Sequence, residues 1–86
     1  MDEYRIEIKK SAGKELKKIK RKDQERIIER IRGLAQNPRP PGSKKLSGEE
    51  KYRIRQGDYR ILYQIFDDTV LVVIVKIAHR RDVYKK

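Results

Sequence analysis

Arginines are concentrated in the segment Lys51–Phe66, which reads as two strands on either side of Gly57. With a two-residue turn that includes Gly57, the residue numbers of two directly paired positions add up to an odd number. Arg53, Arg55 and Arg60 then lie on the same face of the hairpin. The planar donor fork of a guanidinium binds two phosphate oxygens at once and stays charged at physiological pH. The spacing therefore predicts a face that binds a phosphodiester, where grouped arginines could also stabilise a pentavalent phosphorane during cleavage.

An acid-base group for such a cleavage is available in the C-terminal segment, which we expect to lie beside the arginine face. His79 is the side chain whose ordinary pKa lies near neutrality, so it is the first candidate for a general base. It is followed by two guanidiniums, Arg80 and Arg81, and by the phenol of Tyr84. In the alternative interpretation His79 is a surface residue and Tyr84 a packing residue.

The net charge favours an anionic partner. The 86 residues contain 24 lysines and arginines against 13 aspartates and glutamates, which gives a formal charge of +11. Such a charge produces a positive potential over much of a small protein and attracts a polyanion. The alternative, a solvated shell of ion pairs like that of heat-adapted proteins, would be nearer to neutral.

A second group of basic residues precedes the hairpin, in a region of helical periodicity. Its members are Lys14, Lys17, Lys18, Lys20, Arg21 and Lys22. Most of them point away from the apolar stripe of that region, so they could bind RNA phosphates or simply form a solvated helix face. Lys51 and Arg81, beside the arginine face and in the C-terminal segment, are further RNA-binding candidates.

The composition excludes several kinds of site. The chain has no cysteine and one histidine, which excludes disulfides, thiolate metal sites and multi-histidine metal sites. We therefore expect neither a metal nor a cofactor. The longest apolar run, Val70–Val75, is far shorter than the roughly 20 residues of a membrane helix, and the N-terminus lacks a signal-peptide core. We expect a cytoplasmic protein with a single domain over residues 1–86.

The hydrophobic periodicity predicts an α+β fold of order β-α-α-β-β-β, with two N-terminal helices packed on a small, mainly antiparallel sheet. Ser11 and Asp23 are the predicted N-caps of the helices, and the second helix ends before Asn37-Pro38. The predicted strands are Tyr4–Ile8, Tyr52–Arg55, Tyr59–Phe66 and Val70–Ile77.

Two of these strands carry further predictions about burial. Val70–Val75 contains no polar residue, so we expect it to lie centrally in the sheet and to be buried on both faces. In the hairpin, Tyr52, Ile54, Tyr59 and Ile61 would face the core, opposite the arginines.

The order of elements and several motifs resemble the RelE/ParE superfamily of bacterial and archaeal toxins, and its RelE branch in particular. The most specific motifs are Gly-x-Tyr-Arg-x-x-Tyr at Gly57–Tyr63 and His-Arg-Arg-x-Val-Tyr at His79–Tyr84, and the resemblance spans nearly the whole chain. Leu46-Ser47-Gly48 and Tyr52-Arg53-Ile54-Arg55 are also similar. The resemblance implies a toxin that enters the ribosomal A site, contacts ribosomal RNA and cuts mRNA without a metal. It also implies a cognate antitoxin that wraps the basic domain.

By position, the resemblance places Arg53 and Arg55 where RelE enzymes have two basic strand residues. It matches Arg60 to their phosphate-binding arginine, Arg80 to a second arginine and Tyr84 to their C-terminal tyrosine. The ribose 2′-hydroxyl would attack the adjacent phosphate, so the substrate must be RNA.

One departure from the RelE pattern affects the general base. RelE enzymes often have lysine where this chain has Arg53 and Arg55, and an arginine cannot readily give up a proton. Another residue must then act as the base. His79 is the first candidate and Tyr84 the second, and the loop acids at positions 49 and 50, Glu49 and Glu50, are alternatives.

Two other functions are compatible with the sequence. ParE-like members share the architecture but inhibit DNA gyrase through protein contacts, and they are thought to lack the basic catalytic set that this chain has. A module that occupies ribosomal or other RNA without cutting it would need the charge but no proton transfer.

Overall fold

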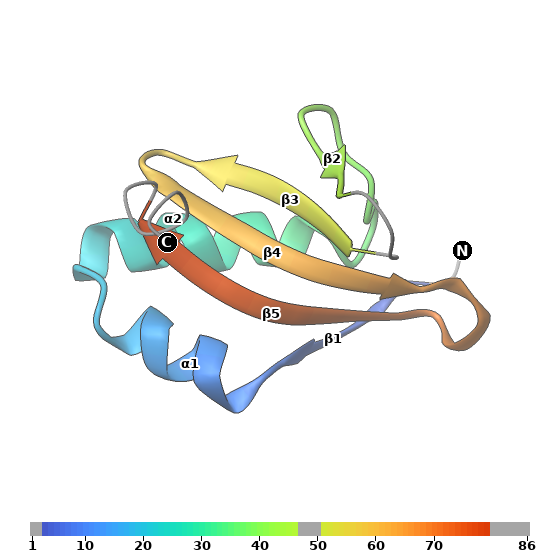
Figure 1. Cartoon of the computed structure of the whole chain (residues 1–86), viewed down its shortest axis with the longest axis horizontal. Helices are drawn as coiled ribbons and strands as arrows, with labels where there is room; N and C mark the ends of the chain where they lie inside the picture. Colours follow the sequence, from blue (N-terminus) through green and yellow to red (C-terminus); the bar gives the residue numbers. More distant parts are fainter. Residues whose placement is uncertain (1–2, 47–50, 80–86) are drawn as a thin grey trace.

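The computed structural model describes residues 3–46 and 51–79, which form a five-stranded sheet covered by two helices (Figure 1). The helices are α1 (Lys10–Lys17) and α2 (Arg21–Gly33). The strands are β1 (Arg5–Ile8), β2 (Lys44–Lys45), β3 (Lys51–Gln56), β4 (Tyr59–Phe66) and β5 (Leu71–His79), with a 3₁₀ turn, η1 (Asp67–Thr69), between β4 and β5. The spatial order is β1-β5-β4-β3-β2.

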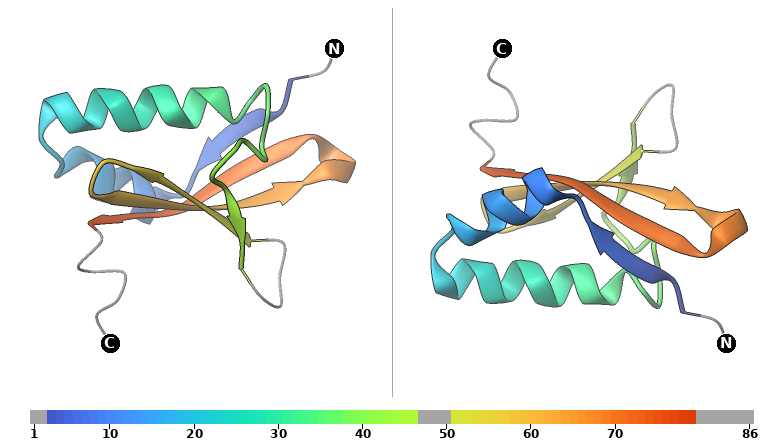
Figure 2. Two further views of the ribbon diagram at one scale, coloured as in Figure 1. Left: turned by 90° about the horizontal axis from the view of Figure 1, so that it is seen from above. Right: turned by 90° about the horizontal axis from the view of Figure 1, so that it is seen from below.

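Both helices lie on the same side of the sheet, where α1 packs against β5 and α2 against β3 (Figure 2). The pair β1–β5 is parallel and the other three pairs are antiparallel. The predicted α+β fold, with two helices on a mainly antiparallel sheet, is therefore confirmed. The sequence did not reveal β2, because two residues are too few to show a period.

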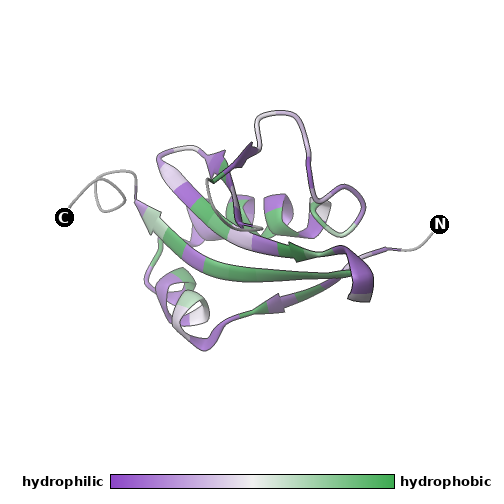
Figure 3. Ribbon diagram, turned by 45° about the vertical axis from the view of Figure 1, so that its right-hand side comes forward, coloured by the Kyte–Doolittle hydropathy of each residue, from purple (hydrophilic) through white to green (hydrophobic). Residues whose placement is uncertain are grey.

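The core lies between the helices and the sheet. The helix side of the core includes Ile27 and Ile31 of α2 and Leu34 at its C-terminal end, all of which are buried. The sheet side includes the buried Ile54 of β3 and Ile61 of β4. Hydrophobic residues extend along the long central strands, while the outward sides of the helices are hydrophilic (Figure 3). The predicted apolar face of the hairpin is thus the face that the helices cover.

Both helices begin earlier than the sequence predicted. Lys9 and Lys20 occupy the N-cap positions, and neither makes a side-chain capping hydrogen bond. Ser11 therefore lies within α1 rather than capping it, and Asp23 lies in the first turn of α2. An acidic side chain there still stabilises the helix, because it faces the partial positive charge of the helix N-terminus.

The prediction that the apolar strand would be buried on both faces is wrong on one side. β5 is flanked by β1 and β4, so its central position is confirmed. Val72 and Ile74 are buried under the helices, whereas Leu71, Val73 and Val75 are only half-buried. The physical reason is that both helices cover one face, which leaves the other face without a helix layer among the described residues.

A buried tyrosine anchors the proline-containing loop to the sheet. Tyr63 is fully buried, and its hydroxyl donates a hydrogen bond of 2.7 Å to the carbonyl oxygen of Pro38. Its ring stacks on that of Tyr52, with 5.8 Å between ring centroids. Burial raises the pKa of Tyr63 to about 12, because the phenolate would lose its hydration.

A second network joins the same loop to two further segments. The guanidinium of Arg39 donates two hydrogen bonds, of 3.3 and 2.9 Å, to the carboxylate of Asp67 in η1, and Nε donates to the hydroxyl of Tyr52 at 3.1 Å. Tyr4, just before β1, donates its hydroxyl to Asp67 at 2.6 Å. These hydrogen bonds, that of Arg39 first, hold the pKa of Asp67 below its usual range.

We expect Tyr63→Phe to lower the free energy of unfolding at neutral pH by about 1–3 kcal/mol, because the carbonyl of Pro38 loses its buried donor. The raised pKa of Tyr63 stabilises the fold fully below pH 10, the ordinary value, and this contribution is lost as the pH rises through about 12. Urea unfolding at pH 8 and pH 11 should therefore show a smaller alkaline loss in the variant than in the wild type. Equal losses would contradict this assignment.

Among the described residues, the helices are too short and too polar for either one to cross a membrane.

Candidate functional site

The hairpin β3–β4 turns at Gly57-Asp58, since Gln56 pairs with Tyr59. Gly57 has a φ of +61°, which fits the first central position of a type II′ turn and favours glycine. The turn brings Arg55 directly opposite Arg60. The odd-sum register that the sequence predicted is therefore the one observed.

Three arginines share the face of the sheet that points away from the helices. Arg53 lies two residues before Arg55 and hence on the same side as the opposed pair Arg55–Arg60. Arg60 is 5% exposed, Arg53 is half-buried and Arg55 is exposed. Lys51 also lies on this face, in register with Gln64. We call the surface formed by Arg53, Arg55 and Arg60 the basic face.

Two further cations adjoin the basic face, and the sequence analysis missed both. Lys44 of β2 is the register partner of Arg53. Arg30 of α2, Lys44, Arg53, Arg55 and Gly42 line one cavity of about 260 Å³. Gly42 has a φ of +91°, a conformation that favours glycine and lets the loop bend beside these side chains. Neither cation follows from the hairpin pattern, because they belong to elements distant in sequence.

His79 lies on the opposite face of the sheet from the arginines. It is the register partner of Tyr59, whose ring packs against the core, and the two rings meet edge to face with centroids 5.4 Å apart. His79 also lines a cavity of about 410 Å³ together with Glu15, Lys18 and Ile19, on the side of α1. The expectation that the imidazole lies beside the guanidiniums is wrong for this structure.

A β-bulge explains this placement. From Phe66↔Leu71 to Tyr63↔Ile74 the partners sum to an odd number, but from Leu62↔Lys76 onward the sum is even. The extra residue on β5 reverses which face each later side chain occupies. Without the bulge His79 would lie on the face of Arg60, and with it His79 lies on the face of Tyr59.

Comparison with known proteins places the chain in a family. A family model described as the ParE toxin of the type II toxin-antitoxin system, parDE, matches residues 6–84. The chain belongs to the RelE/ParE family of type II toxins. The RelE1 protein of Methanocaldococcus jannaschii is 34% identical over 86 aligned residues, which cover 95% of this toxin and 96% of that protein.

Solved structures of RelE toxins share the fold of this toxin. In the RelE–RelB complex from Pyrococcus horikoshii, the similar chain is 30% identical with a TM-score of 0.82, covering 90% of this chain and 94% of that chain. In the RelBE2 toxin–antitoxin complex from Mycobacterium tuberculosis, the values are 28% and 0.80, covering 91% and 99%. The predicted RelE resemblance is thus confirmed for family and fold.

The basic residues of the helical region lie on a different surface of the toxin from the basic face. They belong to α1, to the turn after it and to the start of α2, and all six side chains are exposed: Lys14, Lys17, Lys18, Lys20, Arg21 and Lys22. Arg21 forms an ion pair with Glu25 at 3.4 Å, one helical turn further along. Binding of RNA by these residues stays a prediction.

Several predicted site residues lie outside the described residues of the toxin. They are Arg80, Arg81 and Tyr84, together with the alternative bases Glu49 and Glu50. Their predicted roles rest on the sequence. The structure therefore brings Arg53, Arg55 and Arg60 together and separates His79 from them.

Proposed function

We propose that this toxin is an endoribonuclease that cuts mRNA in the ribosomal A site. The observation that carries the proposal is the shared face of Arg53, Arg55 and Arg60 on the hairpin β3–β4. Like charges opposed across strands destabilise a hairpin, so a face of this kind calls for a reason other than folding. A bound phosphodiester supplies one, because each guanidinium can donate two hydrogen bonds to phosphate oxygens.

The proposed reaction needs RNA and no metal. The 2′-oxygen of a ribose forms a bond to the adjacent phosphorus while the bond from phosphorus to the 5′-oxygen breaks, which leaves a cyclic phosphate and a 5′-hydroxyl. The 2′-hydroxyl gives its proton to a general base, and the leaving 5′-oxygen takes up a proton. The guanidiniums of Arg53, Arg55 and Arg60 would stabilise the extra negative charge of the pentavalent phosphorane.

The position of His79 predicts which candidate base is dispensable. Loss of a general base typically slows a reaction by about 10²- to 10⁴-fold. Because His79 lies on the helix-covered face, we expect His79→Ala to leave the single-turnover cleavage rate and its pH profile close to those of the wild type. Tyr84→Phe is expected to show the full loss. A loss of about 100-fold in His79→Ala, in a protein that remains folded, would return the imidazole to the mechanism.

An antitoxin is the second proposed partner. The similar toxins from Pyrococcus horikoshii and Mycobacterium tuberculosis were solved as complexes with their antitoxins. We propose that an acidic or amphipathic antitoxin segment covers this toxin as well. The formal charge of +11 would speed the encounter with an acidic partner.

Inhibition of DNA gyrase is the second candidate function, because the matching family model is described as a ParE toxin. A gyrase inhibitor acting through protein contacts does not need three guanidiniums on one face. The two functions separate in one experiment on cells that express the toxin. DNA breaks with intact mRNA would support the gyrase function, and cut mRNA with intact DNA would support the nuclease.

The direct test adds the purified toxin to ribosomes programmed with a defined mRNA and maps the transcript ends. We expect cuts within the codon in the A site. The same RNA without ribosomes should be cut slowly or not at all. Salt-sensitive ribosome binding with no cleavage would instead support a passive RNA-binding module.

A further inference from the structure

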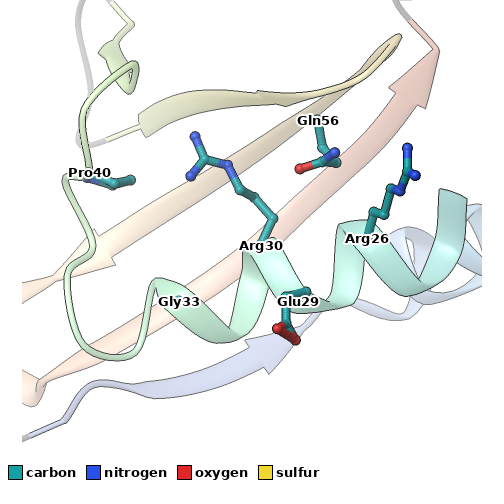
Figure 4. A pocket seen from close by; sticks show the side chains of 6 residues that line it. All are labelled: Arg26, Glu29, Arg30, Gly33, Pro40 and Gln56. Carbon is teal, nitrogen blue, oxygen red and sulfur yellow. The ribbon is translucent and has the colours of Figure 1, made fainter.

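Two cavities lie between α2 and the edge of β3, and we call them together the basic groove. One cavity, of about 360 Å³, is lined by Arg26, Glu29, Arg30, Gly33, Pro40 and Gln56 (Figure 4). Arg30 also lines the cavity of about 260 Å³ beside the basic face. In Figure 4 the side chains of Arg26 and Arg30 extend from α2 toward β3. Because Arg30 lines both cavities, they adjoin each other at its side chain.

The groove carries an excess of positive charge. Five cationic side chains line the two cavities, against the single carboxylate of Glu29: Arg26, Arg30, Lys44, Arg53 and Arg55. Within residues 3–46 and 51–79, none of the five forms an ion pair. Arg26 and Arg30 are four residues apart, so they project from the same side of α2. Clustered like charges that outnumber their counter-charges favour binding of a polyanion.

The lining also leaves room for a polymer. Gly33 has no side chain, and a Cβ atom placed there would meet nothing within 4 Å. At Gly42 a Cβ atom would meet Nη2 of Arg30 at 4.0 Å, so the glycine keeps the loop clear of that guanidinium. Pro40 offers an apolar ring, and Gln56 an amide that can donate and accept hydrogen bonds. These groups suit the ribose and base of a nucleotide whose phosphate is bound by an arginine.

We propose that the groove binds single-stranded RNA next to the cleaved phosphodiester, with Arg30 and Arg26 contacting successive phosphates beyond it. The strand would leave the basic face, pass the edge of β3 beside Gly42 and continue along α2. This inference rests on the proposed nuclease function, because Arg53 and Arg55 connect the groove to the reacting phosphate. Arg26 and Arg30 would then be binding residues rather than catalytic ones.

The test measures binding of an RNA oligonucleotide carrying 2′-O-methyl groups, which cannot be cut because its nucleophile is blocked. Fluorescence anisotropy over a range of salt gives the slope of log affinity against log salt concentration. We expect Arg26→Ala/Arg30→Ala to make that negative slope shallower by about 1.4, since each contact to a single-stranded phosphate contributes about 0.7 to its magnitude. In the assay of mRNA cleavage on ribosomes, the same variant should have a higher KM and an unchanged kcat.

The matched control is Arg5→Ala/Arg32→Ala, which removes the same charge. Both side chains are exposed; Arg5 lies in β1 at the opposite edge of the sheet, and neither lines the groove. We expect the control to keep the wild-type slope. Equal changes in both double variants would overturn the proposal, because net charge alone would then explain the effect.

Two further outcomes separate this proposal from others. If Arg26→Ala/Arg30→Ala binds RNA normally but binds an acidic antitoxin peptide weakly, the groove is a peptide site and the proposal is wrong. Another result is that the wild type fails to cut mRNA on ribosomes, while the salt slope falls in Arg26→Ala/Arg30→Ala and not in the control. The groove then binds RNA, and only the proposed nuclease function is wrong. If the wild type cuts mRNA but the variant has an unchanged slope and an unchanged KM, the proposal that the groove binds RNA is wrong, while the proposed nuclease function stands.

Discussion

Arg60→Ala is expected to lower the rate of ribosome-dependent mRNA cleavage by roughly 10²- to 10³-fold, the usual effect of removing one preorganised group that stabilises a transition-state charge. Arg60 is 5% exposed, so neighbouring atoms restrict its guanidinium to few positions. A fixed donor does not have to reorganise when the phosphorane forms. Single-turnover cleavage on programmed ribosomes measures the rate, and loss of growth inhibition in expressing cells gives a second readout.

Because Arg60 is buried, its replacement can also affect folding, and thermal unfolding followed by circular dichroism must accompany the rate. Arg60→Lys keeps the charge but lacks the planar fork, so we expect it to recover only part of the activity. Arg53→Gln tests the same face at a half-buried position, where the fold is less sensitive. Folded variants of both arginines that cut at the wild-type rate would remove the basic face from the mechanism.

The hairpin could be predicted from the sequence because its geometry is local. Gly57 fixes the turn, and the alternation of Tyr52, Ile54, Tyr59 and Ile61 fixes the face that is buried. Together these two features determine the register, since a shift by one residue would expose the whole apolar set. The arginine face then follows from the core face.

The position of His79 could not be predicted because it depends on the β-bulge in β5. The bulge lies within Leu71–Val75, a run of apolar residues with no polar position to reveal on which face each side chain lies. Val73 and Val75 are half-buried although they are as apolar as the buried Val72 and Ile74, so hydropathy does not distinguish the two faces. A one-residue irregularity in such a run leaves no trace in the hydropathy pattern, yet it reverses the face of His79.

Arg30 and Lys44 were missed for a different reason. They reach the basic face from α2 and β2, and their proximity depends on tertiary packing rather than on spacing in the sequence. Arg26 and Arg30 are spaced so that they share one side of a helix, but such pairs are common on solvated surfaces and do not by themselves indicate a binding site. Which side of the helix adjoins β3 is decided by the burial of Ile27 and Ile31.

Arg55→Glu is expected to stabilise the fold while it abolishes cleavage. The side chains of Arg55 and Arg60 are directly opposed across β3 and β4, and like charges in this arrangement are destabilising. A glutamate at position 55 replaces the repulsion by an attraction, and opposite-charge pairs contribute about 0.2–1 kcal/mol. A gain of about 1 kcal/mol raises the Tm of a domain of this size by roughly 4–8 °C.

The same substitution places a carboxylate where the phosphate would bind, so we expect the cleavage rate to fall by at least about 100-fold. Arg55→Gln removes the repulsion without the attraction and should give an intermediate Tm. Arg32→Glu changes the net charge equally, but it puts an acid in the last turn of α2, where we expect a small loss of stability. Thermal unfolding and cleavage assays on the three variants decide the matter. If Arg55→Glu lowered the Tm as well as the cleavage rate, Arg55 would be needed for folding. The argument that its charge is retained for RNA at the expense of stability would then fail.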